Sequence, residues 1–279
     1  MKLISYLKLP LTAVRLWFEA NETSFSSPDK WHIFKVLLRL RFKEIGEKKN
    51  TIISEQIFGF QIHAYDYTTL LFLFREIFLT KDYYFTSESA TPRIIDCGAN
   101  IGFSLFFHKY FHPNAEVVAF EPNPSAFELL ALNVKSNGLN QVSLIQKAVS
   151  ENEDPIFFYV NEDKGSLLSS VRNDRGGNTQ IKIETCLLSS YLDRPVDLLK
   201  IDVEGAEWLI LNDLKANTQK LSQVKQVILE YHHRINGEES RLCSFLSYFE
   251  ECGFNYNIRT NYQNQGDFQD LVINFYRGI

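Results

Sequence analysis

The chain has 279 residues and a mass of 32.4 kDa, which fits one large domain or one domain with a smaller extension. Apolar residues make up 45% and charged residues 23%, a composition that argues against wholesale disorder, a collagen-like chain and a multi-span membrane protein. The net charge of −5 gives no reason to expect nucleic acid as a partner.

The charge is divided unevenly along the chain. Residues 1–50 carry 10 Lys and Arg against 5 Asp and Glu, whereas the other 229 residues carry 19 against 29. The basic start could contact an anionic surface such as a membrane face. The alternative is a solvated amphipathic helix without a partner. Peripheral membrane contact through the basic N-terminus is therefore one of two expectations for this segment.

The spacing of the cysteines and the residues at the N-terminus both indicate in which cellular compartment the protein works. The four cysteines are irregularly spaced and form no C-x-x-C pair, which argues against a zinc knuckle or a dense disulfide framework. Lys8, Pro10 and Arg15 interrupt any apolar run near the N-terminus, so we expect no signal peptide. The sequence predicts a cytoplasmic protein with reduced thiols, and leaves peripheral attachment to a membrane open.

The first 90 residues predict a mostly helical extension with a short β segment. Apolar spacing over residues 31–45 is typical of a helix. Residues 51–63 predict strands about a turn at Gly59, and residues 67–80 predict a second, strongly apolar helix.

From residue 93 strand and helix patterns alternate. We predict strands over residues 93–97, 116–120, 142–148, 196–203 and 224–231, with helices between them. This order predicts a parallel sheet with helices on both faces. Residues 254–259 and 270–276 have no helix between them, so they should be antiparallel neighbours.

Residues 155–187 interrupt this alternation. We predict antiparallel strands at 156–160 and 180–185, joined by a polar, glycine-rich stretch interpreted as a mobile insertion that could lie over a site. Phe157 and Tyr159 could help to shape an acceptor pocket, since aromatic faces suit sugar rings.

The sharpest motif is Asp96-Cys-Gly-Ala-Asn-Ile-Gly102, directly after the first strand of the alternating region. Gly98 would allow a tight turn and Gly102 close packing of helix on strand. The spacing departs from the dinucleotide fingerprint G-x-G-x-x-G. A carboxylate at Asp96 would repel a pyrophosphate and attract a cationic amino-acid moiety, which favours S-adenosylmethionine over NAD. The alternative is an ordinary strand–helix turn.

Glu121 ends the second strand, 19 residues after Gly102. An acidic residue at about this distance commonly accepts hydrogen bonds from ribose hydroxyls. The alternative is a carboxylate that stabilises the start of the next helix. Together with the glycine turn, the spacing favours the ribose role.

A second charged group of residues follows the fourth strand. Lys200, Asp202 and Glu204 alternate onto one face near the end of that strand. The first and fourth strands flank the switch point of a doubly wound sheet, so Asp202 should lie beside the glycine turn. The alternative for Lys200 and Asp202 is a buried ion pair.

The fifth strand ends in a third group, in which Glu230 and His232 point to one side. They could meet Asp202 and Glu204 above the sheet. Such a cluster could bind a divalent metal or accept a proton. The alternative for His232 is an ordinary hydrogen bond.

Taken together, these motifs resemble the FkbM-type family of S-adenosylmethionine-dependent methyltransferases. The resemblance covers residues 50–279 and includes Phe120-Glu-Pro122, Leu199-Lys-Ile-Asp-Val-Glu-Gly-Ala-Glu207 and the lead-in Arg75-Glu-Ile-Phe78 with Tyr83-Tyr84. It implies a class I methyltransferase, Rossmann-like α/β fold: a seven-stranded mixed sheet with helices on both faces and an antiparallel last strand. We divide the chain into an N-terminal extension over residues 1–90 and a cofactor-binding domain over residues 91–279.

The resemblance also implies a cofactor and an activity: methyl transfer from S-adenosylmethionine to a hydroxyl of a sugar, glycan or secondary metabolite. Gly98, Asn100 and Gly102 would approach the methionine part, Glu121 the ribose, and Ala148 and Val149 the adenine. The full predicted cofactor-binding set is Asp96, Gly98, Ala99, Asn100, Gly102, Glu121, Pro122, Ala148, Val149 and Asp202.

For catalysis we predict an in-line displacement in which Asp202 or His232 accepts the hydroxyl proton. Glu204 and Glu230 would orient the substrate or a metal. Two other classes stay open, a NAD-type oxidoreductase on the same sheet and a non-catalytic methyltransferase-like module. The sequence also leaves metal dependence and the oligomeric state open.

Overall fold

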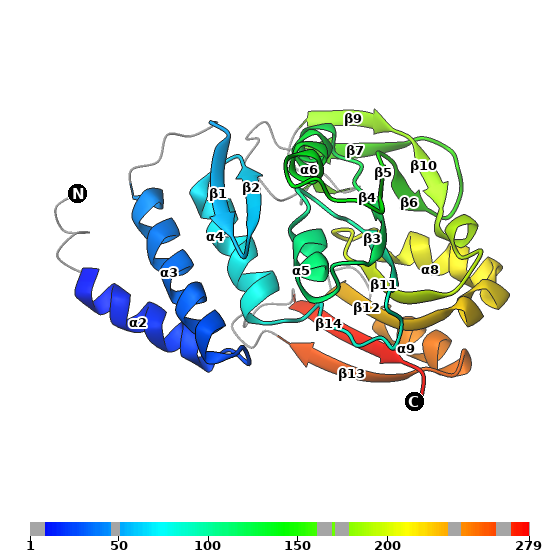
Figure 1. Ribbon diagram of the computed structural model, residues 1–279. Helices are drawn as coiled ribbons and strands as arrows, with labels where there is room; N and C mark the ends of the chain where they lie inside the picture. The colour runs from blue at the N-terminus through cyan, green and yellow to red at the C-terminus, as the bar shows by residue number, and fades with distance from the viewer. Residues whose placement is uncertain are drawn as a thin grey trace.

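The computed structural model describes residues 9–45, 51–160, 169–170, 179–233, 241–260 and 269–278. A seven-stranded sheet dominates it, in the order β13-β14-β12-β11-β3-β4-β5 (Figure 1). The strands are β3 (Arg93–Cys97), β4 (Glu116–Phe120), β5 (Val142–Ile145), β11 (Val196–Ile201), β12 (Val224–His233), β13 (Asn255–Thr260) and β14 (Gln269–Tyr276). β14 runs antiparallel to both its neighbours and the other pairs are parallel. The predicted class I methyltransferase fold is confirmed.

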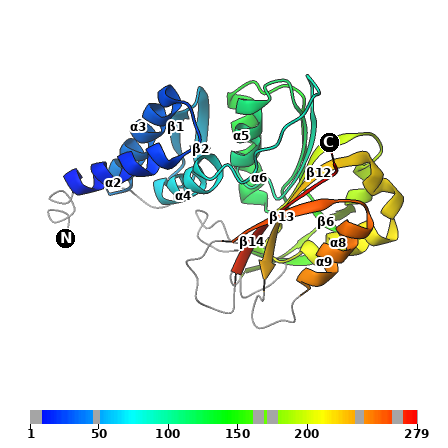
Figure 2. The same cartoon turned by 90° about the horizontal axis from the view of Figure 1, so that it is seen from below.

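The sheet separates two hydrophobic cores. Ile94 and Leu198 are paired in register and face one core, whereas their neighbours Ile95 and Leu199 face the other. Helices α5 (Phe103–Phe111) and α6 (Pro124–Ser136) cover the first face, and α8 (Glu207–Ala216) and α9 (Leu242–Glu251) cover the second (Figure 2). Because β3 and β11 are buried on both faces, their sequences are apolar at nearly every position.

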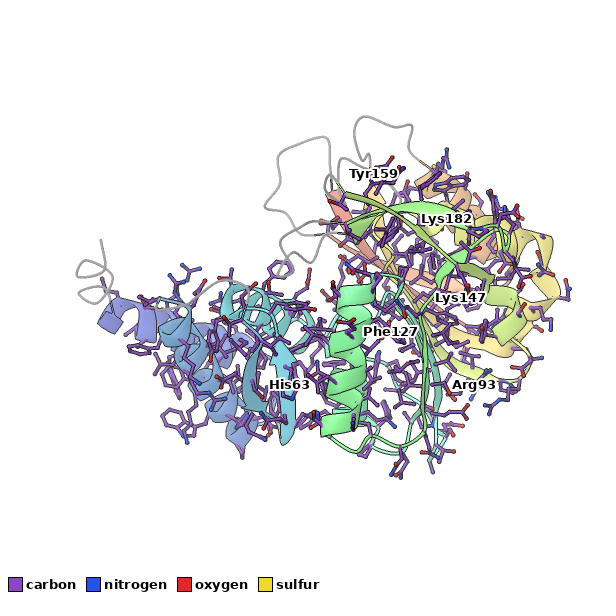
Figure 3. The ribbon with its side chains drawn as sticks, turned by 90° about the horizontal axis from the view of Figure 1, so that it is seen from above. His63, Arg93, Phe127, Lys147, Tyr159 and Lys182 are labelled. Carbon is purple, nitrogen blue, oxygen red and sulfur yellow. The ribbon has the colours of Figure 1, made fainter. Side chains whose placement is uncertain are left out.

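The N-terminal segment packs onto the first of these cores. It consists of α2 (Leu9–Glu22), α3 (Ser27–Glu44), the hairpin β1 (Ile53–Ile57) and β2 (Phe60–Ala64), and α4 (Tyr67–Leu73). Leu37 and Phe74 belong to the same buried cluster as Phe103 of α5. The backbone N–H of His63 donates to the side chain of Asn133 in α6, and Figure 3 shows His63 beside this helix. Hydrophobic packing is therefore continuous across the predicted boundary at residues 90–91.

The predicted helix over residues 67–80 changes its winding half-way. α4 passes directly into a π-helix, η1 (Phe74–Leu79). Inserted π-turns in helices often mark functional sites. η1 carries Glu76 to the wall of the cavity described below.

The strands that follow β5, where the alternation of strand and helix is interrupted, form small sheets of their own. The predicted strand over residues 142–148 ends early, at Ile145, and β6 (Ala148–Ser150) pairs instead with β10 (Thr185–Leu187). β7 (Ile156–Val160) pairs antiparallel with β9 (Thr179–Ile183) as predicted, and with β8 (Ser169–Ser170). Most of the predicted mobile stretch lies outside the described residues.

Two 3-10 helices, η2 (Leu188–Tyr191) and η3 (Thr218–Gln223), flank β11 and α8. Within the described ranges, none of the helices combines the length and the hydropathy of a membrane-spanning segment.

Candidate active site

The glycine turn after β3 is held against the end of β11. Gly98 has φ +88°, and a Cβ there would lie 1.8 Å from the backbone oxygen of Asp202. Only glycine permits so close an approach. Gly102 has φ +92°, and a Cβ would lie 2.8 Å from Leu130 of α6. The predicted tight turn at Gly98 and the predicted place of Asp202 beside it are confirmed, whereas Gly102 faces a side chain of α6 rather than a strand.

Glu121 ties the glycine turn to the end of β4. Its carboxylate accepts the backbone N–H of Asn100 and of Asn123, each at 2.8 Å. Asn100 has φ +50°, a left-handed conformation that this bond helps to hold. Burial raises the pKa of Glu121 to about 7, although the two backbone bonds favour its charged form. A buried acceptor therefore stands where the ribose is predicted to lie.

A cavity of about 710 Å³ opens over these strand ends. Its wall includes eight residues of the predicted cofactor set: Gly98, Ala99, Asn100, Glu121, Pro122, Ala148, Val149 and Asp202. The cavity continues beyond them toward α4, η1 and the end of β12. Its size is within the range of small-molecule sites.

Asp96 lies beneath the cavity. It is fully buried, accepts a hydrogen bond from Ser104, and lies 3.1 Å from the Lys200 ammonium. Lys200 also donates to the carbonyl of Gly98 at 2.8 Å and lies 3.3 Å from Asp202. The prediction that Asp96 attracts a cationic ligand is therefore wrong in this structure, since Lys200 already occupies that carboxylate.

Lys200 forms the ion pair with Asp202 that the sequence left open. Burial alone would lower the pKa of Lys200, but Asp96 and Asp202 outweigh it and raise the pKa. Burial would likewise raise the pKa of Asp202, but Lys200 and His232 outweigh it and lower the pKa. Asp202 is thus a carboxylate on the cavity wall with a fixed cation behind it.

Tyr83 joins Asp202 to Glu230. Its phenol oxygen lies 3.0 Å from Asp202 and 2.9 Å from Glu230. One phenol proton can serve only one carboxylate, so the other contact needs a proton on the acid. Burial and the charge of Asp202 raise the pKa of Glu230 well above its ordinary range. The directions of the two pKa shifts favour Glu230 as the protonated acid and Asp202 as the ionised partner.

His232 is held between carboxylates on the other side of Asp202. Its Nδ1 lies 2.7 Å from Glu207 of α8, and its Nε2 lies 3.4 Å from Glu204 and 3.8 Å from Asp270. Burial would lower the pKa of His232, but Glu207 and Glu204 outweigh it and raise the pKa to about 10. The imidazole is therefore a cation near neutral pH. Of the two predicted proton acceptors, this charge state favours Asp202 over His232, and the four residues lie together as predicted.

Comparison with known proteins identifies the chemistry of such a site. Residues 96–256 match the family described as methyltransferase FkbM domain. The chain belongs to this family. The match spans both strand ends that build the cavity, and it favours methyl transfer over the hydride transfer considered from the sequence.

Two curated relatives carry the same kind of name. The chain is 29% identical to Methyltransferase sdnD of Sordaria araneosa over 192 residues, which cover 57% of this chain and 73% of that protein. It is 27% identical to Methyltransferase 1 of Beauveria bassiana (strain ARSEF 2860) over 165 residues, 51% of this chain and 66% of that one. A solved structure, methyltransferase FkbM from Methylobacillus flagellatus KT, aligns with a TM-score of 0.49 at 14% identity. The alignment covers 94% of this chain and 58% of that chain.

The half of the cavity away from the cofactor set is built by the N-terminal segment of this FkbM methyltransferase. Its wall includes Thr68, Phe72 and Glu76 from α4 and η1, with Tyr83 from the loop that follows. Burial, with Asp202 and Glu204 nearby, raises the pKa of Glu76 to about 8. Our sequence reasoning gave these residues no role. The signal was present, because Glu76 and Tyr83 fall in the lead-in segment that resembles the family.

The aromatic residues predicted for the pocket are on the wrong face of β7. Phe158 and Val160 line the cavity, together with Ile181 of β9. Phe157 is 60% exposed, because successive side chains of a strand point to opposite faces. Residues 161–168 and 171–178 of the predicted insertion lie outside the described residues.

Asp202, Glu204 and His232 form the donor set for the metal considered from the sequence. One ligand atom from each lies within 4.8 Å of the others. Glu207 would orient the imidazole through its contact with Nδ1, as carboxylates behind ligating histidines do in metal sites. A metal on Nε2 would have to displace the proton of an imidazole whose pKa is raised to about 10. The cationic imidazole therefore competes directly with a metal for these carboxylates.

Proposed function

We propose that this FkbM methyltransferase transfers a methyl group from S-adenosylmethionine to a hydroxyl oxygen of a sugar, glycan or secondary metabolite. One observation carries the proposal. A single cavity runs from the glycine turn and Glu121 to the carboxylate of Asp202, which Lys200 keeps ionised.

The cofactor half of the cavity suits S-adenosylmethionine. The carboxylate of Glu121 can accept hydrogen bonds from ribose hydroxyls beside the tight turn at Gly98. Ala148, Val149 and Phe158 offer an apolar wall for the adenine. The carboxylates farther along the wall favour a ligand with a sulfonium and an ammonium.

The residues around Asp202 suit proton removal from an alcohol. S-adenosylmethionine, when bound, supplies an already activated methyl group. On transfer, the acceptor oxygen would bond to that methyl carbon as the carbon–sulfur bond breaks, and the Asp202 carboxylate would accept the hydroxyl proton. The hydroxyl becomes strongly acidic as this bond forms, so a carboxylate with a low pKa is a sufficient base. Lys200 and Tyr83 fix the carboxylate in place.

The half of the cavity away from the cofactor set would hold the acceptor, and we call it the acceptor half. Its side chains also limit the charge of the substrate. Glu76, Glu204, Glu230 and Asp270 line it together with Asp202. Burial raises the pKa of Glu76 and of Glu230, so the negative charge of this wall comes mainly from Asp202, Glu204 and Asp270. Carboxylate or phosphate groups on the acceptor would face those carboxylates, whereas hydroxyl and amino groups would find hydrogen-bond acceptors. The proposal therefore favours neutral or amino-bearing acceptors.

The test is turnover with a labelled methyl donor on methyl glucoside, glucosamine and glucuronate, using wild type and Asp202→Asn. We expect Asp202→Asn to bind S-adenosylhomocysteine and to lose at least about 100-fold in turnover. Asp193→Asn is the matched control: its side chain is 60% exposed and lies outside the cavity wall, the change weakens a contact with Arg93, and the variant should turn over as wild type does. Unchanged turnover in Asp202→Asn would remove that residue from the mechanism. A methyl group found on nitrogen would contradict O-methylation.

A further inference from the structure

The helices α2 and α3 carry a group of exposed apolar side chains. We call this group the α2–α3 apolar face; it consists of Leu11, Val14, Trp17, Phe18, Trp31 and Phe42. Leu11 is 75% exposed and Phe18 is 60% exposed. Single exposed apolar residues are common on proteins, but a contiguous group marks a contact surface.

The face is continuous from one helix to the other. Residues 11, 14 and 18 follow helical spacing on α2, as residues 31, 35 and 42 do on α3. The ring of Trp17 lies 5.4 Å from that of Trp31 and 5.3 Å from that of Phe34, which joins the two stripes. The two helices lie at the end of the molecule away from the sheet (Figures 1 and 2). The described part of the chain leaves these side chains exposed to solvent.

Positive charge accompanies this apolar face. Arg15 is exposed between Val14 and Phe18, and the ammonium of Lys35 lies 5.3 Å from the ring centre of Trp31. The described residues 9–45 carry six Lys and Arg against four Asp and Glu, a net charge of +2; residues 1–50 as a whole carry +5, whereas the rest of the chain carries −10. Apolar and aromatic side chains interleaved with Lys and Arg are typical of helices that lie in the interface of a membrane.

The charge distribution also distinguishes between two possible partners of this face, a second copy of the chain and a lipid surface. A symmetric dimer through this face would place the same basic surface against itself, which is unfavourable. Contact with the acidic remainder of a second copy would be head-to-tail and would not close into a dimer. A surface of anionic lipid satisfies both the apolar side chains and the basic ones.

We propose that the α2–α3 apolar face binds the enzyme to an anionic lipid surface. Phe18, Leu11 and Val14 enter the boundary between headgroups and acyl chains, and Arg15 and Lys35 contact the headgroups. The acidic sheet region then stays on the side away from the lipid, because its negative charge is repelled. This attachment does not depend on the reaction that the cavity performs.

The test is flotation of the full chain with vesicles of phosphatidylcholine alone and of phosphatidylcholine with phosphatidylserine. Phe18→Ser has a matched control in Phe157→Ser, because both phenylalanines are 60% exposed. Lys35→Glu has a control in Lys135→Glu, an exposed lysine on α6. Circular dichroism and S-adenosylhomocysteine binding establish that each variant is folded.

We expect wild type to float with the phosphatidylserine vesicles only, and to be released by high salt. Phe18→Ser and Lys35→Glu should each lower the bound-to-free ratio about fivefold or more, and the two controls should not. Failure to bind phosphatidylserine vesicles, or equal binding to both vesicles, would overturn the proposal. So would a dimer in sedimentation that Phe18→Ser dissociates, since the face would then be a subunit interface.

Discussion

Tyr83→Phe removes one hydroxyl from the centre of the acidic cluster and leaves the ring in place. The Lys200 ammonium lies 5.0 Å from the centre of that ring, so phenylalanine keeps the packing. The lost group is the one that lies 3.0 Å from Asp202 and 2.9 Å from Glu230. The variant therefore removes the contacts of the hydroxyl with Asp202 and Glu230 and keeps the packing of the ring.

The magnitude follows from the charge of the acceptor. A hydrogen bond to an ionised group contributes about 1.5–3 kcal/mol, which corresponds to a fall in turnover of roughly 10- to 150-fold if the bond positions Asp202 for catalysis. Tyr83 also helps to hold the pKa of Asp202 low. Its loss should raise that pKa, so the fall in activity on acidification should begin at a higher pH than in wild type.

The assay is turnover against pH with a labelled methyl donor, together with calorimetric titration of S-adenosylhomocysteine. Tyr84→Phe is the matched control, because the neighbouring ring is 46% exposed and lies outside the cavity wall. We expect Tyr83→Phe alone to lose turnover while both variants bind S-adenosylhomocysteine. Wild-type turnover and an unshifted pH profile in Tyr83→Phe would refute the role assigned to the hydroxyl.

Three further predictions address the same strand ends. His232 has a pKa of about 10 when folded against an ordinary value of 6.5, so its stabilising contribution is complete below pH 6.5 and is lost as the pH rises through 10. Urea titrations should show the free energy of unfolding falling over that window in wild type and less in His232→Gln; equal slopes would contradict the cationic imidazole. Gly98→Ala should fail to bind S-adenosylhomocysteine or fail to fold, because its methyl would overlap the backbone of Asp202; normal binding by calorimetry would show that the turn can relax. Methyl transfer should persist in excess chelator, since the cation of His232 already neutralises the carboxylates around it; loss of activity that Mn²⁺ restores would establish a metal there instead.

Elements bounded by turn residues were predictable from the sequence. β3, β4 and β7 have the predicted ends, because glycine, proline or polar residues stop each apolar run there. β12 runs two residues further than predicted, to His233, because the antiparallel partner β14 continues to pair with it. The helix over residues 67–80 keeps its place but changes to a π-helix, a change of winding that apolar spacing does not encode.

The candidate site likewise contains residues whose positions the sequence predicts and a residue whose position it does not. Alternation along one strand predicts that Glu230 and His232 share a side, and topology predicts that they meet Asp202. Tyr83 reaches Asp202 and Glu230 across 119 and 147 residues of sequence, which no local pattern reveals.

The charge states of the site residues could not be predicted from the sequence. His232 is a cation because α8 brings Glu207 to its Nδ1. Asp96 is paired because it sits opposite Lys200 in the register of β3 and β11. Each state depends on a neighbour supplied by packing, so a strand-end acid or histidine cannot be assigned a role from its own position.

The measurement that tests the account most directly is calorimetric titration of the full chain with S-adenosylhomocysteine and, in parallel, with NAD. We expect S-adenosylhomocysteine to bind with one-to-one stoichiometry and NAD not to bind. Binding of NAD without binding of S-adenosylhomocysteine would contradict the assignment of the cavity to a methyl donor.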